Sequence, residues 1–246
     1  MKLMIKLFAA LALAPALALA SGHDVRLDKA PIDLANQASL QRGARMFVNY
    51  CLNCHSASYM RYSRLQDLGL SENQIKENLL FTREKPGETM AVAMTKKDAK
   101  EWFGANPPDL SVIARSRGPD WLYTYLRSFY RDDTRPTGWN NVVFEKVGMP
   151  HVMATLQGEQ IAHYRTEKEA NGEEKRVFDR FELIKAGTVS LAEYDAMVGD
   201  LVNYLAWMGE PAKEKRMITG VFVLLFLGMF FIVAYYLKKE FWRDIH

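Results

Sequence analysis

The sequence has little cysteine: only two, Cys51 and Cys54, among 246 residues. It also has little net charge, with 32 basic and 29 acidic side chains, and residues 21–209 taken alone are close to neutral. A domain without a basic excess lacks the electrostatic signature of nucleic-acid binding, so that class of protein is excluded. The chain also lacks internal repeats and low-complexity tracts, and residues 21–209 are enough for one domain with a sizeable core.

The first twenty residues have the pattern of a secretory signal peptide. A basic start at Lys2 and Lys6 precedes a short apolar run, and Ala-Leu-Ala at 18–20 resembles a cleavage site. The alternative, an uncleaved membrane helix, is disfavoured because the apolar run is too short to span a bilayer. We therefore expect residues 1–20 to be removed and the rest of the body to be exported.

The C-terminal end has the opposite character. Residues 217–237 carry no charge, and a helix of this length reaches roughly 30 Å, the thickness of a hydrocarbon core. Tyr235, Tyr236 and Trp242 lie near one end of the run, where aromatic rings prefer the membrane interface. Basic residues flank both ends equally, so orientation follows from the signal peptide. We predict a membrane anchor at 217–237 and a cytoplasmic tail at 238–246.

Both cysteines belong to one short motif, Cys51-Leu-Asn-Cys54-His55. In an exported protein two cysteines often form a disulfide, and Cys-x-x-Cys is also a thiol redox pair. The added histidine favours a third reading, because Cys-x-x-Cys-His is the attachment motif of c-type haem. The thiols add to the two vinyl groups of one porphyrin and the histidine supplies an axial ligand. A single motif predicts one covalently bound haem c.

Two helices are expected around this motif. Apolar spacing predicts a helix that begins near a cap at Asn36 or Ser39 and runs into Cys51. A capping box at Ser190 begins a second helix, whose apolar face continues to Met208. Ordinary core helices have the same pattern, so the helices support a haem domain without proving it.

The sequence offers several candidates for the sixth iron ligand. Met149 lies between Gly and Pro in a loop after the haem motif, where a thioether can be aimed at the iron. Methionine ligation raises the reduction potential, which suits an electron carrier. His151 and Met153 are close rivals, and Met90 and Met94 are weaker ones.

A second motif, Pro-Pro-Asp-Leu-Ser at 107–111, precedes two arginines. Its prolines fix an extended backbone with free carbonyls, and an axial histidine commonly donates its second nitrogen to such a carbonyl. Arg115 or Arg117 could pair with a haem propionate. A plain turn and solvated arginines are the alternatives. The aromatics of the 121–126 stretch could wall a haem or form an ordinary core.

With these motifs in order, the mature chain resembles the cytochrome c1 family, the haem subunits of the cytochrome bc1 complex. The shared pattern runs from CLNCHS through PPDLSVIARSRG, Gly-Met-Pro at 148–150 and Trp-Met-Gly-Glu-Pro at 207–211 to the final membrane span. The resemblance implies that Met149 is the axial methionine, that Arg117 lies near a propionate, and that Pro108 belongs to the haem surroundings.

The resemblance also implies the setting. The partners of the chain would be cytochrome b, a Rieske iron–sulfur subunit, a cytochrome c acceptor and the lipid membrane. The complex would be homodimeric. The location would be the inner membrane of a Gram-negative-type bacterium, with the haem domain in the periplasm.

Two features depart from the family pattern. Residues 161–185 form an insertion that reads as a hairpin about Asn171-Gly172. The chain also lacks a long acidic stretch to steer a basic cytochrome c, so a soluble or a membrane-bound acceptor remains open.

The expected fold class is mainly α: a cytochrome c-like haem domain with insertions over residues 21–210, plus one C-terminal transmembrane helix. The expected function is electron relay from a Rieske centre to a cytochrome c, with no substrate chemistry or catalytic residue of its own. Three alternatives stay open: a stand-alone anchored cytochrome feeding a terminal oxidase, a haem sensor or enzyme with an open sixth site, and a thiol oxidoreductase. The last lacks the βαβ pattern usual beside such a motif.

Overall fold

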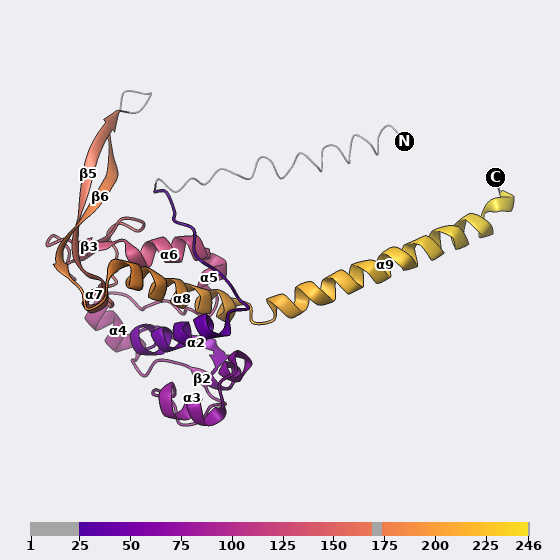
Figure 1. The fold of residues 1–246 in the computed structure, drawn as a ribbon, viewed down its shortest axis with the longest axis horizontal. Helices are drawn as coiled ribbons and strands as arrows, with labels where there is room; N and C mark the ends of the chain where they lie inside the picture. The colour runs from indigo at the N-terminus through magenta and orange to yellow at the C-terminus, as the bar shows by residue number, and fades with distance from the viewer. Residues whose placement is uncertain (1–24, 169–173, 246) are drawn as a thin grey trace.

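The computed structural model describes residues 25–168 and 174–245. These residues form three parts of the molecule (Figure 1). A mainly helical body carries a two-stranded ribbon that projects on one side and a long C-terminal helix that projects on another. The expected signal peptide, residues 1–20, lies outside the described residues. The mainly α fold class is confirmed.

The body is built on the contact between α2 (Gln37–Met46) and α8 (Leu191–Gly209). The Asn36 side chain caps α2 by accepting from Ser39 N, and Ser190 begins α8 with the predicted capping box. Both predicted helices are therefore confirmed. Where they meet, a Cβ on Gly43 would lie 2.1 Å from the backbone oxygen of Asp200, so only glycine allows this approach.

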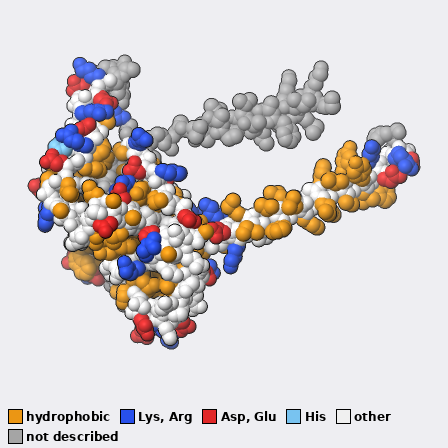
Figure 2. Space-filling model, in the orientation of Figure 1, with side chains coloured by type: hydrophobic (Ala, Val, Ile, Leu, Met, Phe, Trp, Pro, Cys, Tyr) orange, Lys and Arg blue, Asp and Glu red, His pale blue; other side chains and the backbone are white. Residues whose placement is uncertain are grey.

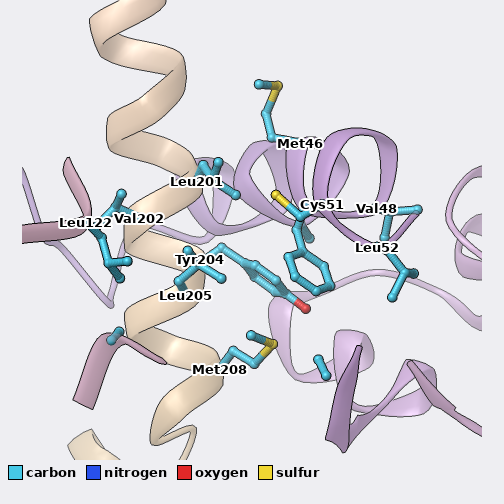
Figure 3. Packing of buried hydrophobic residues seen from close by; sticks show 14 of the residues in the cluster. Met46, Val48, Cys51, Leu52, Leu122, Leu201, Val202, Tyr204, Leu205 and Met208 are labelled. Carbon is cyan, nitrogen blue, oxygen red and sulfur yellow. The ribbon is translucent and has the colours of Figure 1, made fainter. Parts of the chain in front are cut away.

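A π-helical turn, Phe47–Cys51, extends α2 into the cysteine motif. Such turns widen a helix by one residue and are frequent at functional sites. The Phe47 ring packs 5.6 Å from the ring of Tyr204 on α8. Figure 3 shows Cys51 among the buried residues of this core, beside α8. The cysteine motif is thus joined to the hydrophobic core of the body through Phe47 and Cys51.

The remaining helices and strands of the body are short and come between the cysteine motif and α8 in the sequence. Two two-stranded antiparallel sheets, β1 with β2 and β3 with β4, lie among these helices. In chain order the elements are β1 (Ala57–Arg61), the 3₁₀ turn Tyr62–Leu68, α3 (Glu72–Asn78), β2 (Thr89–Met90), α4 (Lys96–Phe103), α5 (Ile113–Ser116), α6 (Pro119–Arg127), β3 (Phe129–Arg131), β4 (Trp139–Asn141) and α7 (Ala154–Gln157).

Helices α5 and α6 pack on α8 and carry the chain from the proline motif toward Met149. The hydroxyl of Tyr194 on α8 donates to the Leu126 carbonyl at 2.9 Å, and Arg127 makes a two-pronged ion pair with Asp195 at 2.5 and 2.7 Å. Charge-assisted paired hydrogen bonds of this kind fix orientation strongly. They hold the C-terminal end of α6 against α8.

The inserted segment is a hairpin, as predicted. Strands β5 (Gly158–Lys168) and β6 (Glu174–Ala186) pair antiparallel over their whole length, with register irregularities at two places. The predicted Asn-Gly turn lies outside the described residues. The base of the ribbon is tied to the body because Gln160 Nε2 donates to the Phe129 carbonyl at 2.8 Å.

The last helix, α9 (Lys213–Phe241), contains the predicted span. It is long and apolar enough to cross a membrane, and none of it is buried among the described residues. In Figure 2 its surface is almost continuously hydrophobic, with basic side chains at both ends. An apolar helix that covers no core needs another apolar medium, and a bilayer supplies one.

Candidate functional site

The cysteine motif folds as a tight turn at the end of the π-helical segment. The amides of Cys54 and His55 both donate to the Cys51 carbonyl, at 3.1 and 2.8 Å. Both cysteines are free thiols; Cys51 is buried and Cys54 is half-buried. Burial, reinforced by the neighbouring Cys54, raises the pKa of Cys51 to about 12, and burial also raises that of Cys54. The two thiols are therefore protonated and lie on one turn of the chain.

The histidine of the motif is held by the proline segment. His55 Nδ1 lies 2.8 Å from the Pro108 carbonyl oxygen. Since a carbonyl can only accept, Nδ1–H donates and the lone pair is left on Nε2. Burial lowers the pKa of His55, while the Pro108 bond and the charge of Asp109 oppose the shift. A neutral imidazole with a free Nε2 is the form that ligates a metal.

Asp109 ties this proline segment to the chain that follows the motif. Its carboxylate accepts from Ser58 N at 2.9 Å and from Ser111 N at 2.8 Å. Partial burial opposes ionisation, but these hydrogen bonds outweigh it and the pKa of Asp109 is lowered. Because Pro108 directly precedes Asp109, this clamp also holds the carbonyl that His55 contacts. The sequence does not reveal this role of Asp109, because its partner Ser58 lies 51 positions away.

Met149 lies in the loop between β4 and α7. It is partly buried against the core, and its Sδ accepts a hydrogen bond from the Tyr125 hydroxyl at 3.4 Å. Met153 is 1% exposed inside the core, and Met90 is fully buried with its sulfur near the Tyr204 hydroxyl. The buried position of these two sulfurs suits packing, whereas the partial exposure of Met149 suits a ligand. Met94 is half-buried in a different loop.

His151, the nearest rival to Met149, is buried in an aromatic box. It is 6% exposed, stacks on Phe129 at 5.0 Å and meets the edges of Trp139 and Tyr194. Burial lowers the pKa of His151 to about 4, against a smaller opposing effect of Gln157. A neutral ring packed on three sides anchors the loop that carries Met149.

A row of side chains links the arginine motif to Met149. The guanidinium of Arg117 lies 5.3 Å from the Trp121 ring, which stacks on Tyr125 at 4.8 Å. Tyr125 in turn meets Phe129 edge-on at 5.0 Å. These four residues recur at every fourth position and so share one face of α6 and its flanks. The aromatic residues Trp121, Tyr125 and Phe129 therefore form a row whose middle member, Tyr125, contacts Met149.

The arginines differ in their surroundings. Arg115 and Arg117 are both exposed, and the stem of Arg115 packs on Gly209. Arg135, which no sequence motif marks, donates from a terminal guanidinium nitrogen to the Lys146 carbonyl at 3.0 Å. Its Nε is buried without a hydrogen-bond partner among the described residues. A buried guanidinium N–H without a protein acceptor is a group that an acidic group of a cofactor would satisfy.

The donor set fits a haem. Two free thiols on one turn, a histidine whose Nε2 keeps its lone pair and a loop thioether are groups of the kind that hold haem c. Within residues 25–168 and 174–245, no group of three or more His, Cys, Asp and Glu could hold a separate metal ion.

A helical body with this donor set, next to a helix able to span a bilayer, defines a membrane-anchored cytochrome. Comparison with known proteins gives the particular family. The profile of the "Cytochrome C1 family" matches residues 28–245. The chain therefore belongs to the cytochrome c1 family, which comprises haem subunits of bc1-type complexes.

Similar proteins cover nearly the whole chain. Cytochrome c1 of Allochromatium vinosum is 53% identical over 237 residues, 96% of each chain. The "Ammonia monooxygenase gamma subunit" of Nitrosomonas europaea is 51% identical over 98% of this chain and 97% of its own. Cytochrome c1 of Rhodospirillum rubrum is 31% identical over 85% of this chain and 83% of its own.

Proposed function

We propose that this chain carries one covalent haem c and relays single electrons from a Rieske iron–sulfur protein to a cytochrome c, within a quinol–cytochrome c oxidoreductase. Thioether bonds from Cys51 and Cys54 would attach the haem, and His55 Nε2 and Met149 Sδ would be its axial ligands. When bound, the haem supplies a one-electron Fe(III)/Fe(II) couple. The family membership supports the haem and electron transfer.

The observation that carries the proposal is the contact between His55 Nδ1 and the Pro108 carbonyl. It selects one tautomer, directs Nε2 away from the protein backbone, and raises the basicity of the ring as a ligand. The Asp109 clamp, which bonds to Ser58 and Ser111, keeps the acceptor in place.

Other residues orient the cofactor and exclude water. The Trp121–Tyr125–Phe129 wall would cover one side of the site, and dry surroundings favour the less charged ferrous state. Arg117 and Arg135 would pair with propionates. With both axial positions filled by protein, no substrate needs to reach the iron, so the chain relays electrons and the complex performs catalysis.

The setting follows from α9. The exported body would lie in the periplasm of a bacterium, and residues 238–246 would lie in the cytoplasm. The helix would hold the haem domain beside cytochrome b and the Rieske subunit, in a homodimeric complex. Only three residues separate α8 from α9. A linker this short gives the domain little freedom to swing away from the membrane.

The thiol oxidoreductase alternative is disfavoured by the state of the thiols. Such an enzyme needs a low-pKa nucleophilic cysteine, whereas burial raises the pKa of Cys51 to about 12. The sheets of the described residues are all two-stranded and antiparallel, which does not match a βαβ scaffold.

A second candidate comes from the Nitrosomonas relative, whose name assigns it to an ammonia monooxygenase. By that likeness, the chain would serve a monooxygenase as an electron-transfer subunit. Identification of its partner subunits separates the two functions.

The experiment is co-purification followed by a functional assay. The chain, tagged after residue 246, is extracted from its native membranes in mild detergent, and the associated subunits are identified by mass spectrometry. Quinol is then added anaerobically and reduction of the c-type haem is followed with and without the Rieske subunit. We expect cytochrome b and a Rieske protein to co-purify, and haem reduction to require the latter.

A Cys51→Ser, Cys54→Ser double variant is the matched control, since it retains the fold's polar turn but cannot form thioether bonds. Recovery of monooxygenase subunits without cytochrome b would refute the proposed complex. Rapid reduction by quinol without the Rieske protein would refute the proposed electron donor.

A further inference from the structure

His151 lies two positions after Met149, and its ring fixes the loop that carries both residues. Only 6% of His151 is exposed, and its ring lies parallel to that of Phe129, at 5.0 Å and an interplanar angle of 3°. The Trp139 ring meets it edge-on at 5.1 Å. Stacked and edge-on ring contacts are favourable and directional. Met149 therefore cannot move far from the body unless the ring of His151 also leaves its place in the core.

The polar edge of this ring faces a second buried side chain, that of Gln157. Gln157 is 4% exposed, and its Nε2 donates to the Arg127 carbonyl at 3.0 Å, which leaves Oε1 as an acceptor. Gln157 raises the pKa of His151 against the larger effect of burial, as an amide oxygen beside a ring N–H would. Neither His151 Nε2 nor Gln157 Oε1 has a hydrogen-bond partner within residues 25–168 and 174–245. Because an unpaired buried polar atom is costly, a bond between this donor and this acceptor is favoured.

Gln157 is itself tied to the rigid part of the body. The Arg127 carbonyl that it contacts also accepts from Gln160 Nε2 at 3.3 Å. The Arg127 side chain is held by Asp195 on α8 through hydrogen bonds of 2.5 and 2.7 Å. The acceptor for His151 is thus tied to the frame formed by α6 and α8, whereas His151 belongs to the loop of Met149.

We propose that His151 and Gln157 are positioning residues that form a latch: the Nε2–H of His151 donates to Gln157 Oε1 and holds the Met149 loop closed, so that the Met149 sulfur stays on the haem iron. The inference rests on the proposed axial role of Met149. The loop then has a closed form, in which Met149 binds iron, and an open form, in which an added ligand can take its position. The latch hydrogen bond exists only in the closed form and therefore sets the fraction of open molecules.

The substitution His151→Phe tests the latch, because it keeps an aromatic ring on Phe129 but removes the donor. Imidazole added to the ferric haem binds the open form, so its apparent affinity rises in proportion to the open fraction. We expect about a tenfold gain in imidazole affinity, equivalent to about 1.4 kcal/mol, the size of one hydrogen bond. Without imidazole, the absorption band for charge transfer from the Met149 sulfur to ferric iron should persist, because the closed form still predominates.

The substitution Gln157→Met removes the acceptor and leaves the ring of His151 untouched. Gln160 still donates to the Arg127 carbonyl in this variant. The gain in imidazole affinity should equal that of His151→Phe, and the double variant should gain no more than either single variant, because both changes remove the same bond. All variants are made in the full chain and titrated in the detergent-solubilised membrane complex. Optical titration follows only haem-loaded molecules, so reduced loading does not prevent the measurement.

The matched control is Tyr164→Phe, which also removes one side-chain hydrogen bond and keeps the ring. The Tyr164 hydroxyl donates to that of Tyr130 at 3.1 Å, on the β5–β6 ribbon and away from the Met149 loop. Its imidazole affinity should equal that of the unaltered chain. If His151→Phe carries no haem, Gln157→Met decides the question by the same criterion.

The outcomes separate the latch from the proposed function. A tenfold gain in both single variants, no further gain in the double variant and no change in the control support the latch. An unchanged affinity in Gln157→Met, additive gains in the double variant, or an equal gain in the control overturns it. Met149→Leu should gain more imidazole affinity than any latch variant, because the competing ligand is lost. An unchanged affinity in Met149→Leu would instead refute the axial role of Met149 in the proposed function.

Discussion

Replacement of Gly43 by alanine is expected to destabilise the body by about 2 kcal/mol. An added Cβ would lie 2.1 Å from the Asp200 backbone oxygen and 2.6 Å from the Tyr204 Cβ, where ordinary contacts are 3.4–4 Å. The nearest atom is backbone, so a side-chain rotation cannot relieve the clash and α2 must move from α8. Overpacking costs about 1–3 kcal/mol. At the upper end of this range, alanine's higher helix propensity offsets about 1 kcal/mol of the cost, which leaves a net loss of about 2 kcal/mol.

The assay is thermal unfolding of the purified chain in detergent, followed by circular dichroism. A loss of about 2 kcal/mol lowers the Tm of a body this size by about 4–8 °C. Gly87→Ala is the control, because its added Cβ would meet nothing within 4 Å. Since α2 leads directly into Cys51, the Gly43 variant should also carry less haem per chain. Equal Tm values for the two variants would refute the packing argument for the contact between α2 and α8.

Further predictions concern the site. Met149→Leu should keep the haem attached but lower its midpoint potential sharply, because a ligand that stabilises Fe(II) is lost. Met153→Leu should leave the potential unchanged, and the opposite pattern would move the ligand to Met153. His55→Ala should abolish the low-spin spectrum, so a retained low-spin band would exclude His55 as the axial ligand. Asp109→Ala should raise the potential, because a looser carbonyl contact weakens imidazole donation. Potentiometric titration measures the potential of this variant, with Asp133→Ala at an exposed carboxylate as the control. Equal potentials for the two variants would show that Asp109 does not position His55.

Much of the architecture follows from local patterns. A capping box, a 3.6-residue apolar period and an uncharged run of membrane length each act within one segment, so α8, α2 and α9 could be predicted from the sequence. The β5–β6 ribbon also followed from alternation about a turn signal. The π-helical turn before Cys51 did not, because helical spacing over so few residues does not distinguish a wide turn from an ordinary one.

The contacts around the site depend on the tertiary structure. Asp109 meets Ser58 across 51 positions, and Tyr125 meets Met149 across 24. A local sequence pattern does not indicate which distant residues will be in contact. The choice between Met149 and His151 shows the same limit. Both lie in one loop, and only packing separates them, since Phe129 and Trp139 enclose His151 while Met149 stays partly exposed.

The most direct test of the central claim is a reduced-minus-oxidised optical spectrum of the tagged chain, taken from its native membranes in mild detergent. The proposed function predicts c-type and b-type haem bands together, both developing when quinol is added. A c-type band alone, in a preparation shown to retain its partner subunits, would contradict the role in a quinol-oxidising complex. Absence of any haem band would contradict the functions assigned to Cys51, Cys54 and His55.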